Sequence, residues 1–196
     1  MYESGVLDLK KDEYVIVLDF LPKGKTEMPP HKRIPIAQVI GTEFFSLLEV
    51  SPKEGVELEA GEKVYIGDEN REEIDHIERR IKYEWLTPTA KSELPIVLES
   101  IVEDGEERFI KFYNTAGTIS TRQHKLEILP TIGKKHRDQI LDEREIEPFK
   151  SFHDMKERLS GISPVKAITE KILEEIKGES KYYLFTPLVE KEKPRR

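Results

Sequence analysis

Two adjacent lysines follow a short turn whose residue types could bind a phosphate group. The turn reads Leu129-Pro130-Thr131-Ile132-Gly133, and Lys134 and Lys135 come directly after it. Pro130 favours the end of one helix and Gly133 the beginning of the next, which leaves backbone N–H groups exposed where the second helix starts. Such N–H groups carry a partial positive charge that attracts anions. The sequence therefore predicts a phosphate-binding turn here.

This turn resembles the hairpin of the helix-hairpin-helix motif, which has the pattern apolar-x-Gly-apolar-Gly and binds nucleic-acid backbone without reading sequence. Leu129, Ile132 and Gly133 match that pattern, whereas Thr131 stands where the first glycine is expected. Because β-branched residues avoid positive φ, we expect Thr131 to adopt a backbone conformation that suits a non-glycine residue. The flanking helices are predicted over Thr121–Leu129 and Lys134–Arg144.

A similar turn occurs 30 residues later, at Leu159-Ser160-Gly161-Ile162-Ser163. It keeps the first glycine of the pattern and replaces the second with Ser163, for which we also expect a non-glycine conformation. Helices are predicted before it, from Phe152 with Ser151 as N-cap, and after it, from Pro164 to Lys177. Two such motifs could present both hairpins to one stretch of nucleic-acid backbone. The residues expected to bind are Thr131, Ile132, Gly133, Lys134, Lys135, Arg137, Gly161, Ile162, Ser163 and Lys166.

The first part of the chain contains short β-branched and aromatic runs, which are typical of strands. Strands are predicted over residues 14–20, 34–40, 42–50, 56–59 and 63–67, with a bend at Gly41. Residues 74–85 fit a helix or a strand, and we favour a strand from Ile77 to Tyr83. Five or six antiparallel strands with short connections predict a small barrel of the oligonucleotide/oligosaccharide-binding (OB) type, or a related one.

Cationic and aromatic side chains in this barrel provide a second set of candidate ligands. The proline-rich loop 21–33 is either a solvated loop or a loop on the barrel rim that contacts nucleic acid. An OB-like surface would stack bases on aromatic rings flanked by cations, although an aromatic residue at strand spacing is commonly a core residue. The loop cations are Lys23, Lys25, Lys32 and Arg33, and the strand candidates are Tyr65, Tyr83, Arg79 and Arg80.

A helical section is predicted to begin at Thr87-Pro88, to break at Asp104-Gly105 and to resume until about Gly117. The expected organisation is thus α+β, an N-terminal OB-like antiparallel β-barrel followed by an all-α tandem helix-hairpin-helix domain. The predicted parts are a barrel over residues 1–86, a helical connector over 87–117, the tandem domain over 118–178 and a C-terminal tail over 179–196, with an aromatic patch and a basic end.

Composition sets limits on the class of protein. The 196 residues are 37% apolar, which allows one large domain or two small ones, and they include no cysteine, which excludes disulfides and cysteine-ligated metals. No apolar run approaches the roughly 20 residues that span a bilayer, and the first residues lack a signal-peptide pattern. We therefore expect a cytoplasmic protein without a membrane partner.

The charge is distributed unevenly. The net charge is −7, but residues 1–117 carry 15 Lys and Arg against 25 Asp and Glu, a net of −10. Residues 118–177 carry 12 against 11, and residues 178–196 carry 5 against 3. The back of the chain therefore permits local backbone contacts, whereas the acidic front opposes nucleic acid.

Several stretches resemble the archaeal family DUF655, whose members are described as predicted RNA-binding or nucleotide-binding proteins. The resemblance covers roughly residues 10–177 and implies an OB-related barrel joined to a helix-hairpin-helix domain. It also implies RNA rather than DNA as ligand and allows a protein partner from the translation or nucleic-acid machinery. The stretches are 79–83 with 86–90, 112–116, 121–124, 126–135 and 148–152, and the block 122–152 is the most specific.

No catalytic or cofactor-binding pattern is evident. The histidines are scattered, and the chain lacks a Walker-type loop and a Gly-x-Ser-x-Gly motif. We therefore predict a non-enzymatic, sequence-tolerant nucleic-acid-binding protein that needs no cofactor. The alternative is a protein-interaction scaffold or adaptor in which the helix-hairpin-helix fold is only structural.

Overall fold

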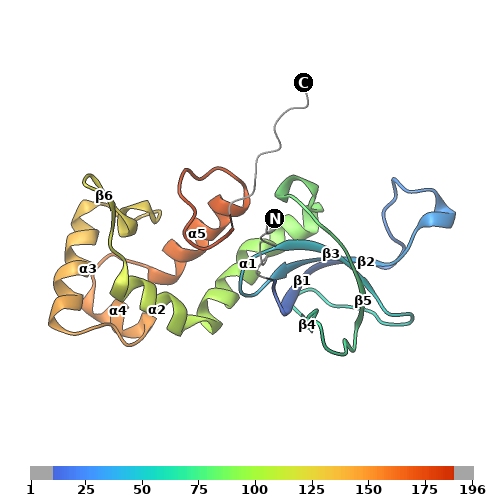
Figure 1. Ribbon diagram of the computed structural model, residues 1–196, viewed down its shortest axis with the longest axis horizontal. Helices are drawn as coiled ribbons and strands as arrows, with labels where there is room; N and C mark the ends of the chain where they lie inside the picture. Colours follow the sequence, from blue (N-terminus) through green and yellow to red (C-terminus); the bar gives the residue numbers. More distant parts are fainter. Residues whose placement is uncertain (1–10, 188–196) are drawn as a thin grey trace, which may run out of the picture. The chain divides into compact units, whose positions relative to one another are not determined.

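The computed structural model describes residues 11–187, which form two compact units (Figure 1). The first unit ends at Ala90 and the second begins at Lys91, so the division falls within the first turn of helix α1 (Pro88–Asp104). The α+β class is confirmed, because a curled antiparallel sheet is followed by a series of helices. None of the helices in the described part is long and apolar enough to cross a membrane.

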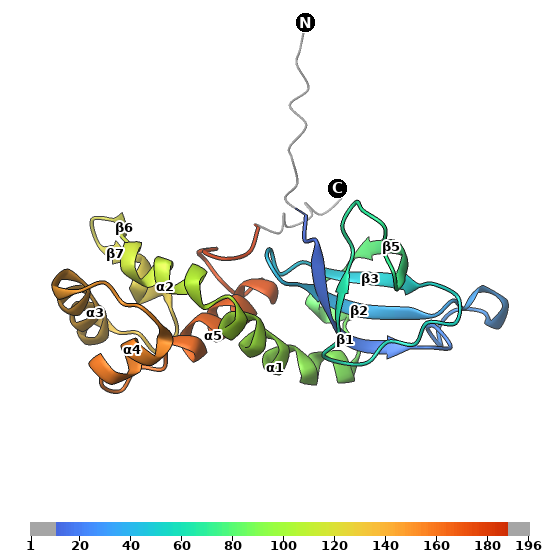
Figure 2. The ribbon, with the colours of Figure 1, turned by 90° about the horizontal axis from the view of Figure 1, so that it is seen from below.

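The first unit contains one five-stranded antiparallel sheet with the order β4-β1-β2-β3-β5 (Figure 2). Apolar side chains from alternate positions of its strands, such as Val15, Val17, Val39 and Val50, form the core. Because β4 and β5 are the two ends of this order, the sheet is a half-barrel that remains open. The strands are β1 (Tyr14–Leu21), β2 (Ile36–Gly41), β3 (Leu47–Pro52), β4 (Lys63–Tyr65) and β5 (Ile74–Arg80).

The strands predicted over residues 14–20, 34–40 and 63–67 are confirmed to within two residues at each end, whereas the strand predicted over 42–50 begins only at Leu47 and no strand forms at residues 56–59. Gly55 and Gly61 have φ values of 81° and 86°, so two turns bracket this segment and leave it too short to pair. Leu58 is nevertheless buried in the core of the sheet. The strand favoured over Ile77–Tyr83 is present but shifted, because β5 runs from Ile74 to Arg80 and Tyr83 lies in a 3-10 helix.

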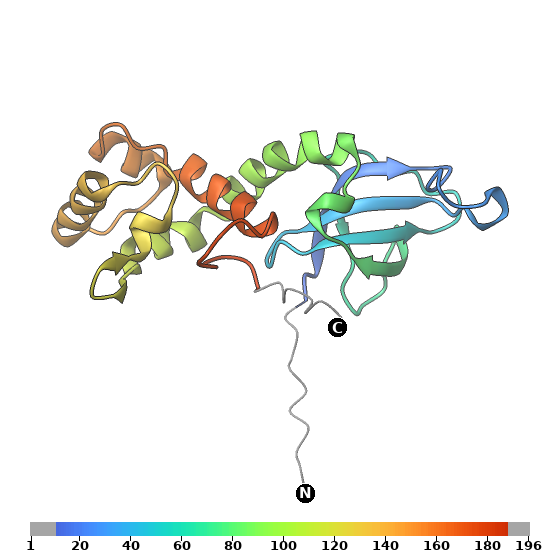
Figure 3. The ribbon, with the colours of Figure 1, turned by 90° about the horizontal axis from the view of Figure 1, so that it is seen from above.

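The helices of the second unit are seen in Figure 3, and outside residues 121–129 they begin and end close to the predicted positions. Thr87 caps α1 as expected, since its Oγ1 accepts the N–H of Ala90 at 3.0 Å, and the break falls at Gly105. The other elements are α2 (Glu106–Thr115), the two-stranded β6 (Thr118–Ser120) and β7 (Gln123–His124), the 3-10 helix η3 (Lys125–Ile128), α3 (Lys134–Ile146), α4 (Phe152–Arg158) and α5 (Pro164–Ile176).

The helix predicted over Thr121–Leu129 is wrong. His124 ends the β6–β7 pair and caps η3, because its Nδ1 accepts the N–H of Leu126 at 3.1 Å while the Glu127 carboxylate accepts the N–H of His124 at 3.2 Å. Only a few residues separate this cap from Pro130, which disfavours helical conformation in the residue before it. A single 3-10 turn therefore replaces the expected α-helix.

The end of the described chain docks on α5. The buried carboxylate of Glu175 accepts the N–H groups of Leu184, Phe185 and Thr186 at 2.7, 3.0 and 2.8 Å. The Phe185 ring packs edge-on against Phe109. The predicted aromatic patch is thus a docked segment, whereas the predicted basic end, residues 188–196, lies outside the described residues.

Candidate nucleic-acid interface

The first predicted turn joins η3 to α3 around a buried isoleucine. Ile132 is 4% exposed, and its N–H donates to the carbonyl of Leu129 at 3.2 Å. Thr131 has a φ of 69°, which lies in the left-handed region and contradicts our expectation of a non-glycine conformation there. The turn must reverse the chain within two residues of Pro130, and this geometry overrides the preference of a β-branched residue.

The second turn joins α4 to α5 and has the same construction. Ile162 is 9% exposed, and Gly161, at the position equivalent to Thr131, has a φ of 76°. Ser163 has a φ of −109°, so the expected non-glycine conformation is confirmed for this residue. Both turns therefore place one left-handed residue before a buried isoleucine.

His136 lies between the two turns. Its Nδ1 is 3.1 Å from the carbonyl oxygen of Thr131, and because a carbonyl only accepts, Nδ1 carries the hydrogen of this bond. Its Nε2 is 3.8 Å from the position that a Cβ on Gly161 would occupy. The two turns are thus neighbours in the second unit, a relationship that the scattered histidines of the sequence did not reveal.

The helices that follow the turns start without a side-chain cap. Neither Gly133 before α3 nor Ser163 before α5 accepts a hydrogen bond from its helix through a side chain. In contrast, Ser151 caps α4, with its Oγ accepting the N–H of Asp154 at 3.0 Å. The first N–H groups of any helix have no partner within the helix. A Cβ on Gly133 would meet no atom within 4 Å, so the backbone at the start of α3 can be approached closely.

The cations beside the turns differ in their availability. Lys134 and Lys135 are exposed, and Lys166 is exposed with its Nζ 3.7 Å from the Glu170 carboxylate. Arg137 instead lies 3.0 Å from Glu127 and 2.6 Å from Asp138. Lys134 and Lys135 are therefore the most accessible candidates for a phosphate contact, whereas Arg137 would have to break its ion pairs with Glu127 and Asp138.

Two cations of the first unit neutralise a buried carboxylate. Lys25 Nζ lies 2.5 Å and Arg79 Nε 2.8 Å from the carboxylate of Glu49, which is 1% exposed. Burial alone would raise the pKa of Glu49, but hydrogen bonds from Lys25, Arg79 and Gln38 outweigh it and hold the pKa below its ordinary value. Both cations thus form an ion pair with a buried residue of the sheet, and neither is an isolated surface charge.

The remaining candidates of the first unit are spread over different places. Arg33 donates to the carbonyls of Met28 and Thr26 and so braces its own loop. Lys23 is exposed, and the side chain of Lys32 lies outside the described part of the structure. The loop cations whose side chains the structure describes thus differ in role, since Lys25 pairs with Glu49, Arg33 braces its loop and Lys23 is exposed.

Arg80 lines a cleft of about 820 Å³ in the first unit and donates to Ser46 Oγ at 2.6 Å. Lys11 and Arg71 also line this cleft, but so do four carboxylates, which makes it a poor site for a polyanion. The aromatic candidate Tyr65 packs edge-on against Tyr14 in its wall. The four acidic residues are Asp12, Glu13, Asp68 and Glu69.

The comparisons with known proteins agree with this architecture. A family model described as "Protein of unknown function (DUF655)" matches residues 11–187. The chain belongs to the DUF655 family. It is 47% identical over 178 residues to "Uncharacterized protein MJ0038" of Methanocaldococcus jannaschii, covering 90% of this chain and 80% of that protein. The crystal structure of Af1531 from Archaeoglobus fulgidus, also DUF655, is 44% identical, with a TM-score of 0.84 over 90% of this chain and 100% of that one.

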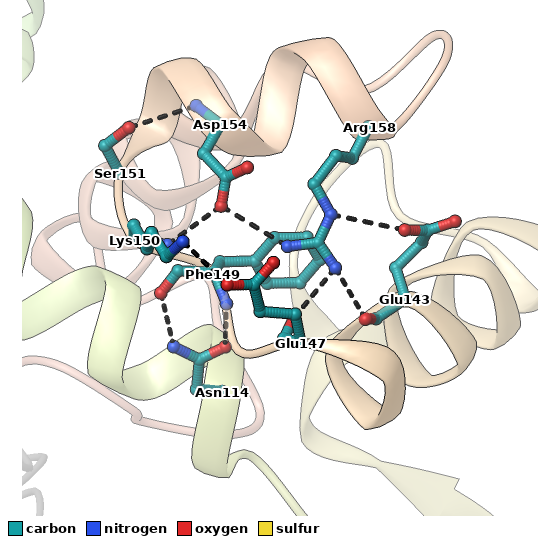
Figure 4. Close-up of polar contacts among 8 residues, drawn as sticks. All are labelled: Asn114, Glu143, Glu147, Phe149, Lys150, Ser151, Asp154 and Arg158. Atoms are coloured by element: carbon teal, nitrogen blue, oxygen red, sulfur yellow. Dashed lines mark hydrogen bonds and ion pairs between the residues drawn. The ribbon is translucent and has the colours of Figure 1, made fainter.

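An arginine fixes the link between the two turns in this DUF655 chain (Figure 4). Arg158, at the end of α4, donates to the main-chain carbonyls of Glu143 at 2.6 Å and Glu147 at 2.8 Å, at the end of α3. Its guanidinium carbon lies 4.5 Å from the centroid of the Phe149 ring, and its Nη1 is 3.3 Å from Asp154. The link from α3 to α4 is therefore braced, and with it the spacing of the turns.

Within residues 11–187, no group of three or more histidine, aspartate or glutamate side chains is placed to hold a metal ion.

Proposed function

We propose that this chain is a non-enzymatic protein that binds the phosphate backbone of nucleic acid through the two turns of its second unit. The observation that carries the proposal is the match between the turns. Each has a left-handed residue, at φ 69° and 76°, followed by a buried isoleucine and a helix without a side-chain cap. Uncapped helix starts offer N–H donors and a favourable dipole to an anion.

The finer fold names belong to this proposal. We interpret η3 with α3 and α4 with α5 as two helix-hairpin-helix elements, the first of which has a 3-10 turn in place of its leading helix. We interpret the half-barrel as an OB-like domain, because OB folds are five-stranded, partly open barrels. Both interpretations favour contact with nucleic acid.

The geometry around His136 supports a single ligand for both turns. Because His136 reaches from the carbonyl of Thr131 to the side of Gly161, the N–H groups that begin α3 and α5 can face neighbouring phosphates of one strand. Lys134 and Lys135 add charge on one side and Lys166 on the other. Backbone N–H groups and lysines hold phosphates without reading bases, so binding should tolerate any sequence.

RNA is the preferred ligand in this proposal. The preference comes from the resemblance to the family described above, since phosphate contacts by themselves do not distinguish RNA from DNA. Sequencing of the nucleic acid that is crosslinked to the protein in cells would identify the class directly. Recovery of DNA in place of RNA would overturn the preference and leave the backbone-binding proposal intact.

The test is an affinity measurement with charge-reversed variants. Lys134→Glu combined with Lys135→Glu should abolish binding of single-stranded RNA in fluorescence anisotropy at constant salt. The matched control, Lys111→Glu combined with Lys181→Glu, makes the same change in net charge at two exposed lysines outside the turns and should leave most of the affinity. Equal losses in both double variants, or no loss in the first, would contradict the proposal.

A protein-interaction scaffold is the second candidate. The ion pairs of Lys25 and Arg79 with Glu49 favour a scaffold, because Glu49 neutralises part of the positive charge that these side chains could offer to nucleic acid. A protein partner that co-purifies after nuclease treatment, together with unchanged RNA affinity in the Lys134→Glu, Lys135→Glu variant, would favour the scaffold.

A further inference from the structure

Trp85 is the only tryptophan of the chain, and its side chain is 52% exposed. It ends the 3-10 helix η2 (Tyr83–Trp85), between strand β5 and helix α1. Half of this large ring contributes nothing to the core, because apolar surface stabilises a fold only where it is removed from water. The exposed ring is instead part of an ordered arrangement of polar side chains.

Arg79 lies over the Trp85 ring, with its guanidinium carbon 5.3 Å from the ring centroid. Three hydrogen bonds hold this pair in place. The Nε of Arg79 donates to Glu49 at 2.8 Å, and the side-chain amide of Gln38 donates to Glu49 at 3.1 Å and to the carbonyl of Trp85 at 3.0 Å. A buried carboxylate and a buried amide on neighbouring strands thus fix both the cation and the ring.

The position of the chain after Trp85 is fixed in the same way. The N–H of Thr87 donates to the side-chain oxygen of Gln38 at 2.8 Å, and the hydroxyl of Thr87 donates to Asp19 at 2.6 Å. These bonds restrain the backbone that follows Trp85 in the chain. An aromatic ring that is held before its ligand arrives loses little conformational entropy on binding.

The charges beside the ring favour an anion. Lys25 and Arg79 bring two positive charges to the single negative charge of Glu49, so these three side chains carry a net charge of +1. Arg79 is half-exposed, so an incoming group can reach its guanidinium. An exposed aromatic ring flanked by cations is the arrangement that stacks a base and contacts the phosphate next to it.

We propose that Trp85 stacks an unpaired nucleobase of a single-stranded nucleic acid, with Arg79 and Lys25 contacting the adjoining phosphate. The proposal rests on the function proposed above and adds the class of ligand to it. A base within a duplex is already stacked on both faces, so this site selects single strands. Trp85 did not stand out in the sequence, because a tryptophan at strand spacing is as readily a core residue.

The fluorescence of Trp85 provides a direct test, since no other tryptophan contributes to the signal. A short single-stranded oligouridylate should quench and shift the emission in proportion to occupancy, whereas an abasic oligonucleotide with the same number of phosphates should leave it unchanged and bind less tightly. Equal affinity for the two, or an emission that oligouridylate leaves unaltered at saturation, would overturn the proposal.

Variants separate stacking from folding. Trp85→Ala should weaken oligouridylate binding about 5- to 150-fold, the range for loss of one stacked base, and Trp85→Phe should retain most of the affinity. The matched control is Tyr14→Ala, which removes another exposed ring with a cation over it, since Lys63 Nζ lies 5.0 Å from the Tyr14 centroid. Thermal unfolding confirms that each variant is folded. An equal loss with Tyr14→Ala would contradict the assignment to Trp85.

The two proposals fail in different ways. If the turns bind phosphate but Trp85 does not stack, Lys134→Glu with Lys135→Glu weakens binding while oligouridylate and the abasic strand bind alike. If Trp85 stacks but the turns do not bind, oligouridylate quenches the emission of the double lysine variant at the same oligonucleotide concentration as that of the wild type. The Trp85 emission therefore reports on the stacking site, and the effect of the double lysine variant on affinity reports on the turns.

Discussion

The side-chain amide of Asn114 pairs with both main-chain polar groups of Phe149. Its Nδ2 donates to the Phe149 carbonyl at 2.8 Å, and its Oδ1 accepts the Phe149 N–H at 2.9 Å (Figure 4). Asn114 comes from the end of α2, whereas Phe149 lies in the link between α3 and α4, where its ring contacts Arg158. One asparagine thus satisfies the backbone of the segment that spaces the two turns.

Asn114→Ala should lower the free energy of unfolding of the protein. It leaves the N–H and carbonyl of the buried Phe149 without these partners, which costs about 1–3 kcal/mol. Urea denaturation measures the change, and Asn70→Ala, at an exposed loop residue, serves as the control with no expected effect. A loss no larger than in the control would show that water replaces the side chain.

The left-handed residues of the two turns predict opposite responses to substitution. That conformation costs a non-glycine residue about 1–2 kcal/mol, and glycine loses about 0.5–1 kcal/mol in chain entropy, so Thr131→Gly should raise the free energy of unfolding by up to about 1.5 kcal/mol.

Gly161→Ala should instead lower that free energy by up to about 1.5 kcal/mol, because its φ is 76° and the nearest atom leaves room for a methyl group. Chemical denaturation of both variants gives the signs. Destabilisation by Thr131→Gly would mean that the threonine side chain contributes more than its backbone costs.

His124 predicts a specific loss of stability in mild acid. Burial lowers the pKa of His124, and the positive charges of Arg144 and Arg137 lower it further. The folded chain therefore takes up this proton less readily than the unfolded chain, whose histidine has a pKa of about 6.5. The contribution of neutral His124 to the free energy of unfolding is complete above that pH and is lost as the pH falls through the lowered pKa.

The His124→Asn variant isolates this effect, because asparagine is also a good N-cap and does not titrate. Melting temperatures measured from pH 8 to pH 5 should fall more steeply for the wild type than for the variant. All other titrating groups are common to both proteins, so parallel curves would exclude His124 as the cause.

Glu49→Gln should destabilise the first unit by about 1.5–3 kcal/mol, because Lys25 and Arg79 lose charged hydrogen bonds. Glu54→Gln, at an exposed position, is the control. Since the pKa of Glu49 is lowered on folding, its contribution is present above the ordinary pKa of a glutamate and is lost as the pH falls through the lowered value. The difference in stability between wild type and variant should therefore shrink in acid.

Local signals in the sequence predicted most elements. Pro130 and Gly133 placed the first turn, Thr87-Pro88 placed the start of α1, and the β-branched run at residues 14–20 placed β1. These patterns act over a few residues, so they can be read without knowing the fold. The helix expected before Leu129 was wrong because a histidine cap, which is uncommon, ended β7 there.

The candidate site depended on relationships that local patterns do not contain. The φ of Thr131 follows from the geometry of the whole turn, and His136 meets Gly161 only because the two turns are neighbours. Lys25 and Arg79 look like surface cations in the sequence, yet both neutralise Glu49, which is far from each along the chain. Local patterns therefore placed the two turns along the chain but did not reveal that Lys25 and Arg79 share one buried carboxylate.

The salt dependence of RNA binding tests the central claim most directly. If Lys134 and Lys135 each neutralise a phosphate of a single strand, replacing both with alanine should make the slope of log affinity against log salt shallower by about 1.4. Lys111→Ala with Lys181→Ala should keep the wild-type slope. A wild-type slope in the Lys134→Ala, Lys135→Ala variant would contradict phosphate binding at the turns.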